Sequence, residues 1–402
     1  MTNCLYLNSL FFSIIESMKF SCRTSDLLHA LHLVSRAISN QQALPILGNI
    51  LFEVEGKRCT VSATDLELSI VTSFTASIEN EGAITVPAKA ILNFAQYNSD
   101  AEVLLETTEG TQLKCTSKQA KTVIAGEAAT EYPTITSIEK EESFSLDAAP
   151  LLDALHMVTF ASAKSTLRPV LSGVYLRAEK GQLIFVATDS YRLSEYKAKM
   201  AGGAGDISCI IPAKVLEELR AILSTKKEEK GKEEAKDDKK KEAPKKVDIT
   251  LSAQQIEIGF ENTKLLSRLI EGKFPDYQQI IPKESKTQVV LSTKELLTTV
   301  KRMHYFAKEV NNNLTLQVTK NSVHITTPQT QAGKDEATLQ TDVKGDSNKI
   351  ALSSSYLLDF LGHVDDNTVE MHITDSMHPA VFRLPSRAES LHLIMPLRLQ
   401  DE

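Results

Sequence analysis

The chain has 402 residues, of which 42% are hydrophobic and 24% are charged, and its formal net charge is −7. At about 150 residues per domain, this length predicts two to four domains and excludes a small protein held together by disulfides or metals. No stretch of about 18 apolar residues offers a membrane span, and the five cysteines form no CxxC pair. We therefore expect a cytoplasmic protein with reduced thiols and no membrane association. A nucleic-acid partner would require positive charge gathered on one face.

The N-terminal segment contains an apolar run at 4–15 that resembles the core of a signal peptide. No Lys or Arg precedes this run and no small-residue cleavage site follows it, so a signal peptide is not favoured. We expect residues 1–17 to be a disordered extension, or the product of a start codon assigned too early. The folded chain would then begin at Met18.

Six segments share one pattern, in which a short alternating strand runs into an amphipathic helix that starts with N-cap residues. They are residues 20–38, 84–97, 144–162, 207–223, 289–306 and 350–364. Equivalent helix positions are Leu28, Ile91, Leu152, Leu216, Leu297 and Leu357, so the steps between them are 63, 61, 64, 81 and 60 residues. One step is out of line, and a repeat with an insertion explains it.

The insertion is residues 226–246, a run of twenty-one residues with ten lysines and seven acids, and removing it restores a step of 60. Mixed Lys and Glu runs can form a solvated helix, but Gly231, Pro244 and the lack of apolar residues favour a disordered surface loop. Its charge is +3, which leaves −10 for the rest of the chain.

A longer period of 124 residues relates Phe20 to Phe144, Pro45 to Pro169 and Asp65 to Asp189. Pairs of the six units therefore form domains, and we expect an extension at 1–17 followed by domains at 18–139, 140–283 and 284–402. Period-2 alternation at 59–71 and 182–196 predicts strands with one buried face. The predicted fold is α+β, with three tandem repeated domains in which two helices back antiparallel sheets.

The motifs of common active sites are missing: the sequence has no GxxxxGK[ST], HExxH or GxSxG. His29 and His32 stand three apart on a predicted helix without a third metal ligand, and the glycines at 202–205 precede a strand instead of a helix. Asp65 and Asp189 recur at the repeat period and are typical of turns. We expect no catalytic residue, no cofactor and no metal site.

Basic residues recur on the predicted helices of an otherwise acidic chain. Lys89 and Lys214 both follow Pro-Ala at the start of a helix, where a cation opposes the helix dipole. Ordinary solvated charge is the simpler interpretation of any single one, but their recurrence favours a shared role in binding DNA. The predicted DNA-binding residues are Arg36, Lys89, Lys164, Arg168, Lys214, Arg220, Lys301 and Arg302.

From residue 18 to 399 the sequence resembles the beta subunits of bacterial DNA polymerase III, the sliding clamps. The motifs that carry the resemblance are LPILGN at 44–49, TDLE at 64–67, RPVLSG at 168–173, ATD at 187–189 with RL at 192–193, FPDY at 274–277 and MPLRL at 395–399. The resemblance implies a head-to-tail homodimer, in which each chain is half of a closed ring around duplex DNA. It also implies a processivity factor, a subunit of the polymerase holoenzyme that catalyses nothing itself.

In this family a pocket between the second and third domains accepts short peptides from its partners. These are the replicative polymerase alpha subunit, the clamp loader complex and other replication and repair proteins. Carried over to this chain, the pocket comprises Leu171, Thr188, Tyr191, Arg192, Leu193, Pro275, Leu393, Met395, Pro396, Leu397 and Arg398. The residues alone would also fit a buried final strand at 393–399.

The resemblance also implies a dimer contact of Phe306 with Val123 and Ile124 of the partner subunit. Three features depart from the family pattern. Gln41 stands where many relatives have a basic residue, for which Arg36 can substitute. Ser190, Tyr191 and Gln279 differ from the residues that relatives often have at these pocket positions. Residues 400–402 extend beyond the usual end of the family's chains.

An alternative function is a clamp-fold scaffold, such as a specialised second clamp that does not act at the replication fork.

Overall fold

The computed structural model describes residues 18–39, 44–108, 111–138, 142–165, 167–200, 207–228 and 246–399. The predictions for residues 1–17, Gln41, the glycines at 202–205, most of the insertion and residues 400–402 lie outside these ranges. The chain divides into two compact units. Unit 1 comprises Met1–Ser137 and Glu261–Leu266, and unit 2 comprises Ile138–Phe260 and Ser267–Glu402.

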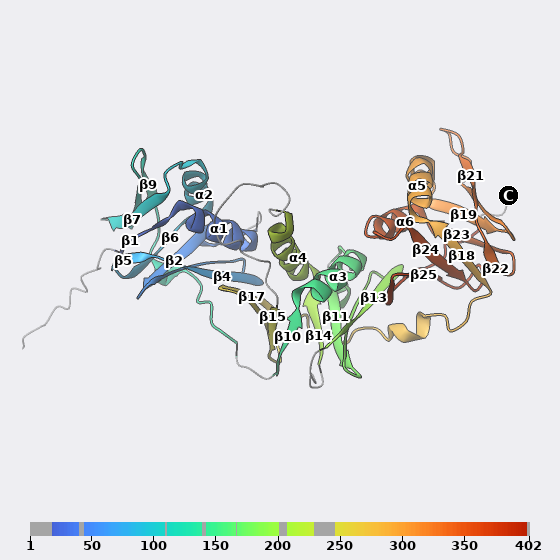
Figure 1. Cartoon of the computed structure of the whole chain (residues 1–402), viewed down its shortest axis with the longest axis horizontal. Helices are drawn as coiled ribbons and strands as arrows, with labels where there is room; N and C mark the ends of the chain where they lie inside the picture. Colours follow the sequence, from blue (N-terminus) through green and yellow to red (C-terminus); the bar gives the residue numbers. More distant parts are fainter. Residues whose placement is uncertain are drawn as a thin grey trace, which may run out of the picture. The chain divides into compact units, whose positions relative to one another are not determined.

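Unit 1 holds the first domain, whose described strands form two antiparallel layers. One layer has the strand order β5-β1-β7-β8-β9, and the other has the order β6-β2-β3-β4 with β17 beside β4. Helix α1 packs on β3 and β4 and lies against α2 (Figure 1). The elements are β1 (Lys19–Arg23), α1 (Thr24–Val34), β2 (Asn49–Glu55), β3 (Arg58–Thr64), β4 (Leu68–Thr75), β5 (Ser77–Asn80), β6 (Gly82–Pro87), α2 (Ala88–Tyr97), β7 (Glu102–Thr108), β8 (Gln112–Thr116), β9 (Lys121–Ala125) and β17 (Thr263–Arg268).

The first half of unit 2 is the second domain. Its described strands form the layers β10-β15-β16 and β14-β11-β12-β13, and α3 packs on β12 and β13 and against α4. The elements are β10 (Glu142–Asp147), α3 (Ala148–Val158), β11 (Gly173–Glu179), β12 (Gln182–Thr188), β13 (Arg192–Lys199), β14 (Ser208–Pro212), α4 (Ala213–Glu228), β15 (Lys246–Leu251) and β16 (Gln255–Phe260), with short 3-10 turns η4 (Thr159–Ala161) and η5 (Pro169–Leu171).

The second half of unit 2 is the third domain. Its layers are β21-β20-β19-β23 and β26-β25-β24-β18-β22, and α5 and α6 lie side by side (Figure 1). The elements are β18 (Thr287–Ser292), α5 (Thr293–Ala307), β19 (Asn313–Val318), β20 (Ser322–Thr326), β21 (Glu336–Gln340), β22 (Val343–Gly345), β23 (Asn348–Ser353), α6 (Ser354–Leu361), β24 (Thr368–Ile373), β25 (Ala380–Leu384) and β26 (Arg387–Ile394), with η7 (Tyr277–Ile280) before them. The predicted fold of three tandem α+β domains, each with two helices in its described residues, is confirmed.

All six predicted strand-helix units are present, from β1-α1 to β23-α6. The expected capping is found in part. Ser292 and Ser353 cap α5 and α6 with their side chains, but α1 begins one residue after Arg23, which has no capping side-chain bond. Thr24 is the first helical residue, and its hydroxyl donates to the Asp100 carbonyl.

The aspartates that recur at an interval of 124 residues form the predicted turns. Asp65 Oδ1 accepts hydrogen bonds from the backbone N–H groups two and three residues later, at 3.1 and 2.8 Å. Asp189 does the same at 2.9 and 3.0 Å. The residue after each aspartate is left-handed, with φ of 76° at Leu66 and 79° at Ser190. The turn from β3 to β4 and the turn from β12 to β13 are therefore of the same type.

The expectation of strands with one buried face is wrong for β12, whose residues are buried on both faces except at its start. It is also wrong for β13, whose residues 192–196 are all buried. Both strands lie inside a sheet and are covered by α3. The predicted bounds of the loop at 226–246 are also wrong. Helix α4 continues to Glu228 and β15 begins at Lys246, while residues 229–245 lie outside the described ranges.

Strands β13 and β26 pair antiparallel and join the second domain to the third within unit 2. His392 of β26 is fully buried there, stacked on Phe360 at 4.5 Å, and shares a 2.7 Å hydrogen bond with Ser194 Oγ through Nδ1. Its Nε2 has no hydrogen-bond partner among the described residues. Burial, together with the charge of Arg192, holds the pKa of His392 well below its usual 6.5. The imidazole is therefore neutral in the folded protein.

Replacing residues 229–245 with a short Gly-Ser linker should leave the melting temperature within about 3 °C of wild type, because the sequence predicts a loop there and loop length changes stability weakly. Deleting residues 226–246 should lower it further, since that also removes the last residues of α4 and the first of β15. Scanning calorimetry of both variants measures the difference. Equal losses would contradict the observed ends of α4 and β15.

Acidification should destabilise the protein through His392. The unfolded chain binds a proton near pH 6.5 and the folded chain only at lower pH, so stability is complete above this value and falls by up to about 1.4 kcal/mol per pH unit below it. Thermal unfolding at about pH 7.5 and about pH 5.5 should show a smaller pH effect in His392→Asn than in wild type. His324→Asn, at a half-exposed position, serves as the control. An unchanged pH effect in His392→Asn would contradict the assignment.

Candidate functional site

The paired strands β13 and β26 build the floor of the candidate site. Their register places Leu193 opposite Leu393, and side chains along each strand alternate between two faces. On one face Leu193 and Leu393 join a buried cluster with Leu171 and Phe274, and Met395 packs against it. Four of the predicted pocket residues, from different parts of the chain, are thus brought together.

The predicted pocket residues differ in how accessible they are. Leu193 and Leu393 are completely buried, so they support the floor and do not offer contact surface. Pro275 and Arg398 are exposed. Strand β26 ends at Ile394, and Met395 is half-buried. The alternative of a buried final strand therefore holds only as far as residue 394.

The turn between β12 and β13 presents Tyr191, whose exposed fraction is 62%. Thr188 Oγ1 accepts from the Ser190 N–H at 3.1 Å and donates to the Arg192 carbonyl at 2.6 Å, which closes the turn. The Met395 N–H donates to the Tyr191 carbonyl at 2.8 Å. The turn and the C-terminal segment are therefore held together by their backbones.

Arg192 was predicted as a pocket residue, but its side chain is only 4% exposed. Its Nε donates to Asp189 at 3.0 Å and its Nη1 donates to Asp359 of α6 at 2.7 Å. The guanidinium also lies 4.8 Å from the ring of Tyr356, which stacks against Tyr191 at 6.3 Å. Sequence reasoning missed Asp359 and Tyr356. Their spacing of three on a predicted helix puts them on one side of it, but no local signal names Arg192 as their partner.

The end of the described chain is fixed to the third domain. The Leu397 N–H donates to the Ala351 carbonyl at 2.8 Å, and Asn313 Nδ2 donates to the Arg398 carbonyl at 3.3 Å. Pro396 is half-buried. These bonds hold residues 395–398 beside the turn that carries Tyr191.

The predicted DNA-binding residues occupy less uniform positions than expected. Lys89, Lys214 and Lys301 are exposed on α2, α4 and α5, as predicted. Arg302 is exposed but makes a two-pronged ion pair with Asp335 at 2.8 and 3.1 Å, which reduces its free charge.

The other four are half-buried or lie outside the six α-helices of the described ranges. Arg36 is half-buried in a short 3-10 turn, η1 (Ser35–Ala37). Lys164 and Arg168 are exposed, but they lie in the loop between η4 and η5, where Arg168 donates to Ser190 Oγ at 3.3 Å. Arg220 is half-buried on α4 and donates to His156 Nδ1 at 3.0 Å.

The predicted dimer residues also differ among themselves. Val123 is 52% exposed on β9, the outermost of the described strands in its sheet. Ile124, its neighbour, is buried at 5%, because successive strand residues point to opposite faces. The Ile124 side chain therefore packs inside its own domain, and Val123 is the accessible member of the pair. Phe306 is half-buried near the end of α5, next to the exposed Tyr305.

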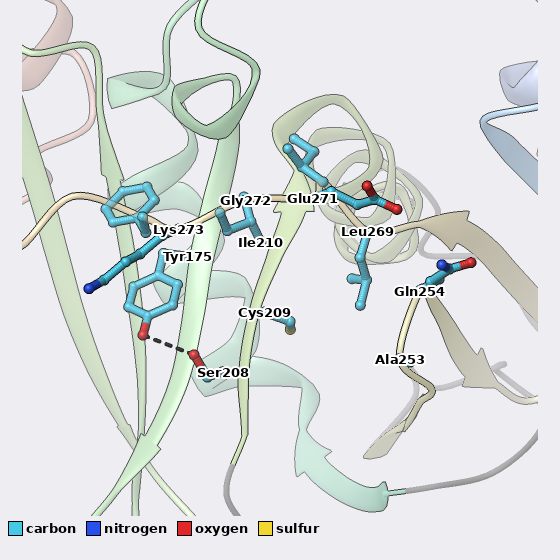
Figure 2. Close-up of a pocket in the computed structure, with 12 residues that line it drawn as sticks. Tyr175, Ser208, Cys209, Ile210, Ala253, Gln254, Leu269, Glu271, Gly272 and Lys273 are labelled. Atoms are coloured by element: carbon cyan, nitrogen blue, oxygen red, sulfur yellow. Dashed lines mark hydrogen bonds between the residues drawn. The ribbon is translucent and has the colours of Figure 1, made fainter.

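A cavity of about 530 Å³ lies beside the floor of the candidate site and shares Ile210 and Phe274 with its cluster. Figure 2 shows Tyr175 on its wall, with a hydroxyl hydrogen-bonded to Ser208 Oγ at 3.1 Å. Burial raises the pKa of the Cys209 thiol in this wall to about 12, so it is a poor nucleophile. None of the eleven predicted pocket residues is among the described residues that line this cavity.

In the described ranges, no group of three or more His, Cys, Asp or Glu side chains is arranged to hold a metal ion. None of the helices in those ranges has the length and apolar content that a membrane span requires.

Comparisons with family models, with related sequences and with solved structures all match this chain to the same family. Family models of the DNA polymerase III beta subunit match residues 18–136 (N-terminal domain), 145–276 (central domain) and 278–398 (C-terminal domain). The beta sliding clamp of Synechocystis sp. is 28% identical over 404 residues, covering 95% of this chain and 100% of that protein. The crystal structure of the Bacillus subtilis sliding clamp has a TM-score of 0.86 at 27% identity, again covering 95% and 100%. A Pseudomonas aeruginosa sliding clamp bound to griselimycin has the same TM-score at 25% identity and the same coverage. The chain therefore belongs to the DNA polymerase III beta subunit family, the beta sliding clamps.

Proposed function

We propose that two copies of this sliding clamp close head to tail into a ring around duplex DNA and tether the replicative polymerase to it. The observation that carries the proposal is the match of three consecutive domains to the three domains of the beta subunit. Three domains per chain and two chains would give six domains around the DNA. The proposal assigns the chain no catalytic step, cofactor or metal, and places it in the cytoplasm.

A clamp has to hold DNA without stopping on it. Enclosure supplies the attachment, so the protein needs only weak attraction to phosphates that does not depend on sequence. The exposed lysines Lys89, Lys214 and Lys301 suit this role. Arg36, Lys164, Arg168, Arg220 and Arg302 contribute less, because they are half-buried, lie off the helices or are paired. The net charge of −7 would repel DNA from the remaining surface.

The peptide site of the clamp lies, in this proposal, above the cluster of Leu171, Leu193 and Leu393. Apolar side chains of a partner peptide would pack on Met395, Pro396 and Leu397, which are half-buried and held by backbone bonds at both ends. Methionine and leucine adapt to ligands of different shape. One site could therefore serve the polymerase alpha subunit, the clamp loader and other replication and repair proteins in turn.

The dimer contact in this proposal uses the outer edge of β9 and the end of α5. Val123 and Phe306 would form its apolar centre. Ile124 supports β9 from inside its own domain.

Ring closure predicts retention on circular but not on linear DNA. Clamp loaded by its clamp loader onto nicked circular DNA should stay bound through gel filtration at about 0.5 M salt, where simple phosphate contacts are screened. Cutting the circle once should release it, because only topology holds it. Light scattering should give about twice the 44.3 kDa chain mass under the same conditions. Equal retention on both DNA forms, or a monomer at all concentrations, would contradict the ring.

Met395→Ala combined with Leu397→Ala should weaken binding to the polymerase alpha subunit by about a hundredfold, since it removes two apolar anchors at about 1–2 kcal/mol each. Surface plasmon resonance with immobilised clamp measures the affinity. Met377→Ala, which truncates an exposed methionine elsewhere in the third domain, is the matched control. Polymerase binding equal to wild type in the double variant would remove these residues from the site.

A further inference from the structure

Helix α1 of the first domain has one side that the domain leaves exposed. Ser25, His29 and His32 are exposed there, at spacings of four and three residues that place them on one side of a helix. The helix packs against β3 and β4, and its buried apolar residues are Leu27, Ala30, Leu31, Leu33 and Val34. The two histidines therefore lie on the side of α1 that is open to a partner.

These histidines are the only side chains of α1 that can carry a positive charge. The helix contains no Lys or Arg, whereas α2, α4 and α5 each carry an exposed lysine. Histidine changes its charge between pH 5 and 8, while lysine stays charged throughout this range. The charge on the exposed side of α1 therefore depends on pH.

The histidine pair belongs to α1 and not to the repeated fold. At the repeat interval of 124 residues, His29 corresponds to Asp153 and His32 corresponds to His156, both on α3. Asp153 is exposed, but His156 is half-buried and accepts a hydrogen bond from Arg220 at 3.0 Å. The fold of a domain does not require an exposed histidine at either position, so packing does not account for the pair.

The elements that pack most closely against α1 bring more positive than negative charge to it. These elements are β1, β3, β4, α2 and η1. Asp26, on α1 itself, is the one carboxylate in this group of elements, and it accepts from Arg23 at 2.8 Å. The remaining titratable side chains of the group are Lys19, Cys22, Arg36, Arg58, Cys59, Lys89 and Tyr97. Protonation of the histidines therefore adds to surroundings that are already positive.

We propose that His29 and His32 are DNA contacts of the first domain, and that their protonation sets how strongly this part of the ring attracts the duplex. This rests on the proposed ring, in which Lys89 of the neighbouring α2 meets phosphates. The lysine supplies a constant attraction, and the histidines add to it as the pH falls. Phosphates beside an imidazole favour its charged form, so the DNA itself strengthens the contact.

The test measures the affinity of the full-length clamp for a short, fluorescein-labelled linear duplex by fluorescence anisotropy. At about 50 mM salt, wild type should bind about tenfold more tightly at about pH 6.0 than at about pH 8.0, the gain expected from roughly one additional phosphate contact. The logarithm of the affinity should also fall more steeply with the logarithm of the salt concentration at the lower pH. EDTA in the buffer excludes a metal ion bridging the two histidines.

Two double variants assign the pH effect to the histidine pair. His29→Gln with His32→Gln should bind with nearly equal affinity at both pH values, because neither side chain can be protonated there. His29→Lys with His32→Lys should bind tightly at both, and this gain at the higher pH cannot result from damaged structure. His324→Gln with His378→Gln is the matched control. It removes two accessible histidines outside the helices and should keep the pH effect of wild type.

A glutamine double variant that keeps the full pH effect, or a lysine double variant that binds as wild type does at the higher pH, would overturn the proposal. Lys89→Gln separates this result from the proposed ring, because it should weaken binding at both pH values. If it does so while the histidine variants have no effect, the ring stands and the histidine contacts fall. If none of these variants changes binding and the clamp is not retained on circular DNA, both proposals fail. Melting temperatures of all variants at both pH values identify any loss of affinity that follows from unfolding.

Discussion

The hydrogen-bonded pairing of β13 with β26 is the constraint on which the rest of unit 2 depends. The pair joins two domains into one sheet, and its two faces have different tasks. One face carries Leu193 and Leu393 into the apolar cluster, and the other carries Arg192 and His392 toward the helices. Because a slip of one residue would exchange these faces, the pattern of apolar and polar residues fixes the register. The pairing of β13 with β26 therefore determines both how the two domains are joined and where the residues of the candidate site lie.

Much of the fold was predictable because its signals are local. The six strand-helix units follow from apolar spacing within about twenty residues, and the two aspartate turns follow from a residue type with one strong preference. The errors arise where distant segments decide. Strand β12 is buried on both faces because α3 covers it, and α1 starts at Thr24, whose hydroxyl is taken by the Asp100 carbonyl. Neither partner is visible in the local sequence.

The residues of the candidate site also separate into those that the sequence could predict and those that it could not. Leu171, Leu193 and Leu393 came from resemblance to the sliding clamps, and the structure places them in one cluster. The pairing of Arg192 with Asp359 could not be predicted, because 167 positions separate the two residues and either could have pointed to solvent. The difference in exposure between Val123 and Ile124 was predictable. Period-2 alternation along β9 requires that Val123 and Ile124 point to opposite faces, so only one of them could be exposed.

The exposed edge of β9 has a consequence for the life of the chain before assembly. A terminal strand with an outward Val123 is a template on which other extended chains can pair, and such edges promote aggregation. In the described part of β9, Lys121 is the one charged residue that opposes this. In the proposed ring, this edge would lie against the partner subunit. The same interface that encloses DNA would then protect newly made protein from misassembly, and selection for solubility and selection for ring closure would act on the same few residues.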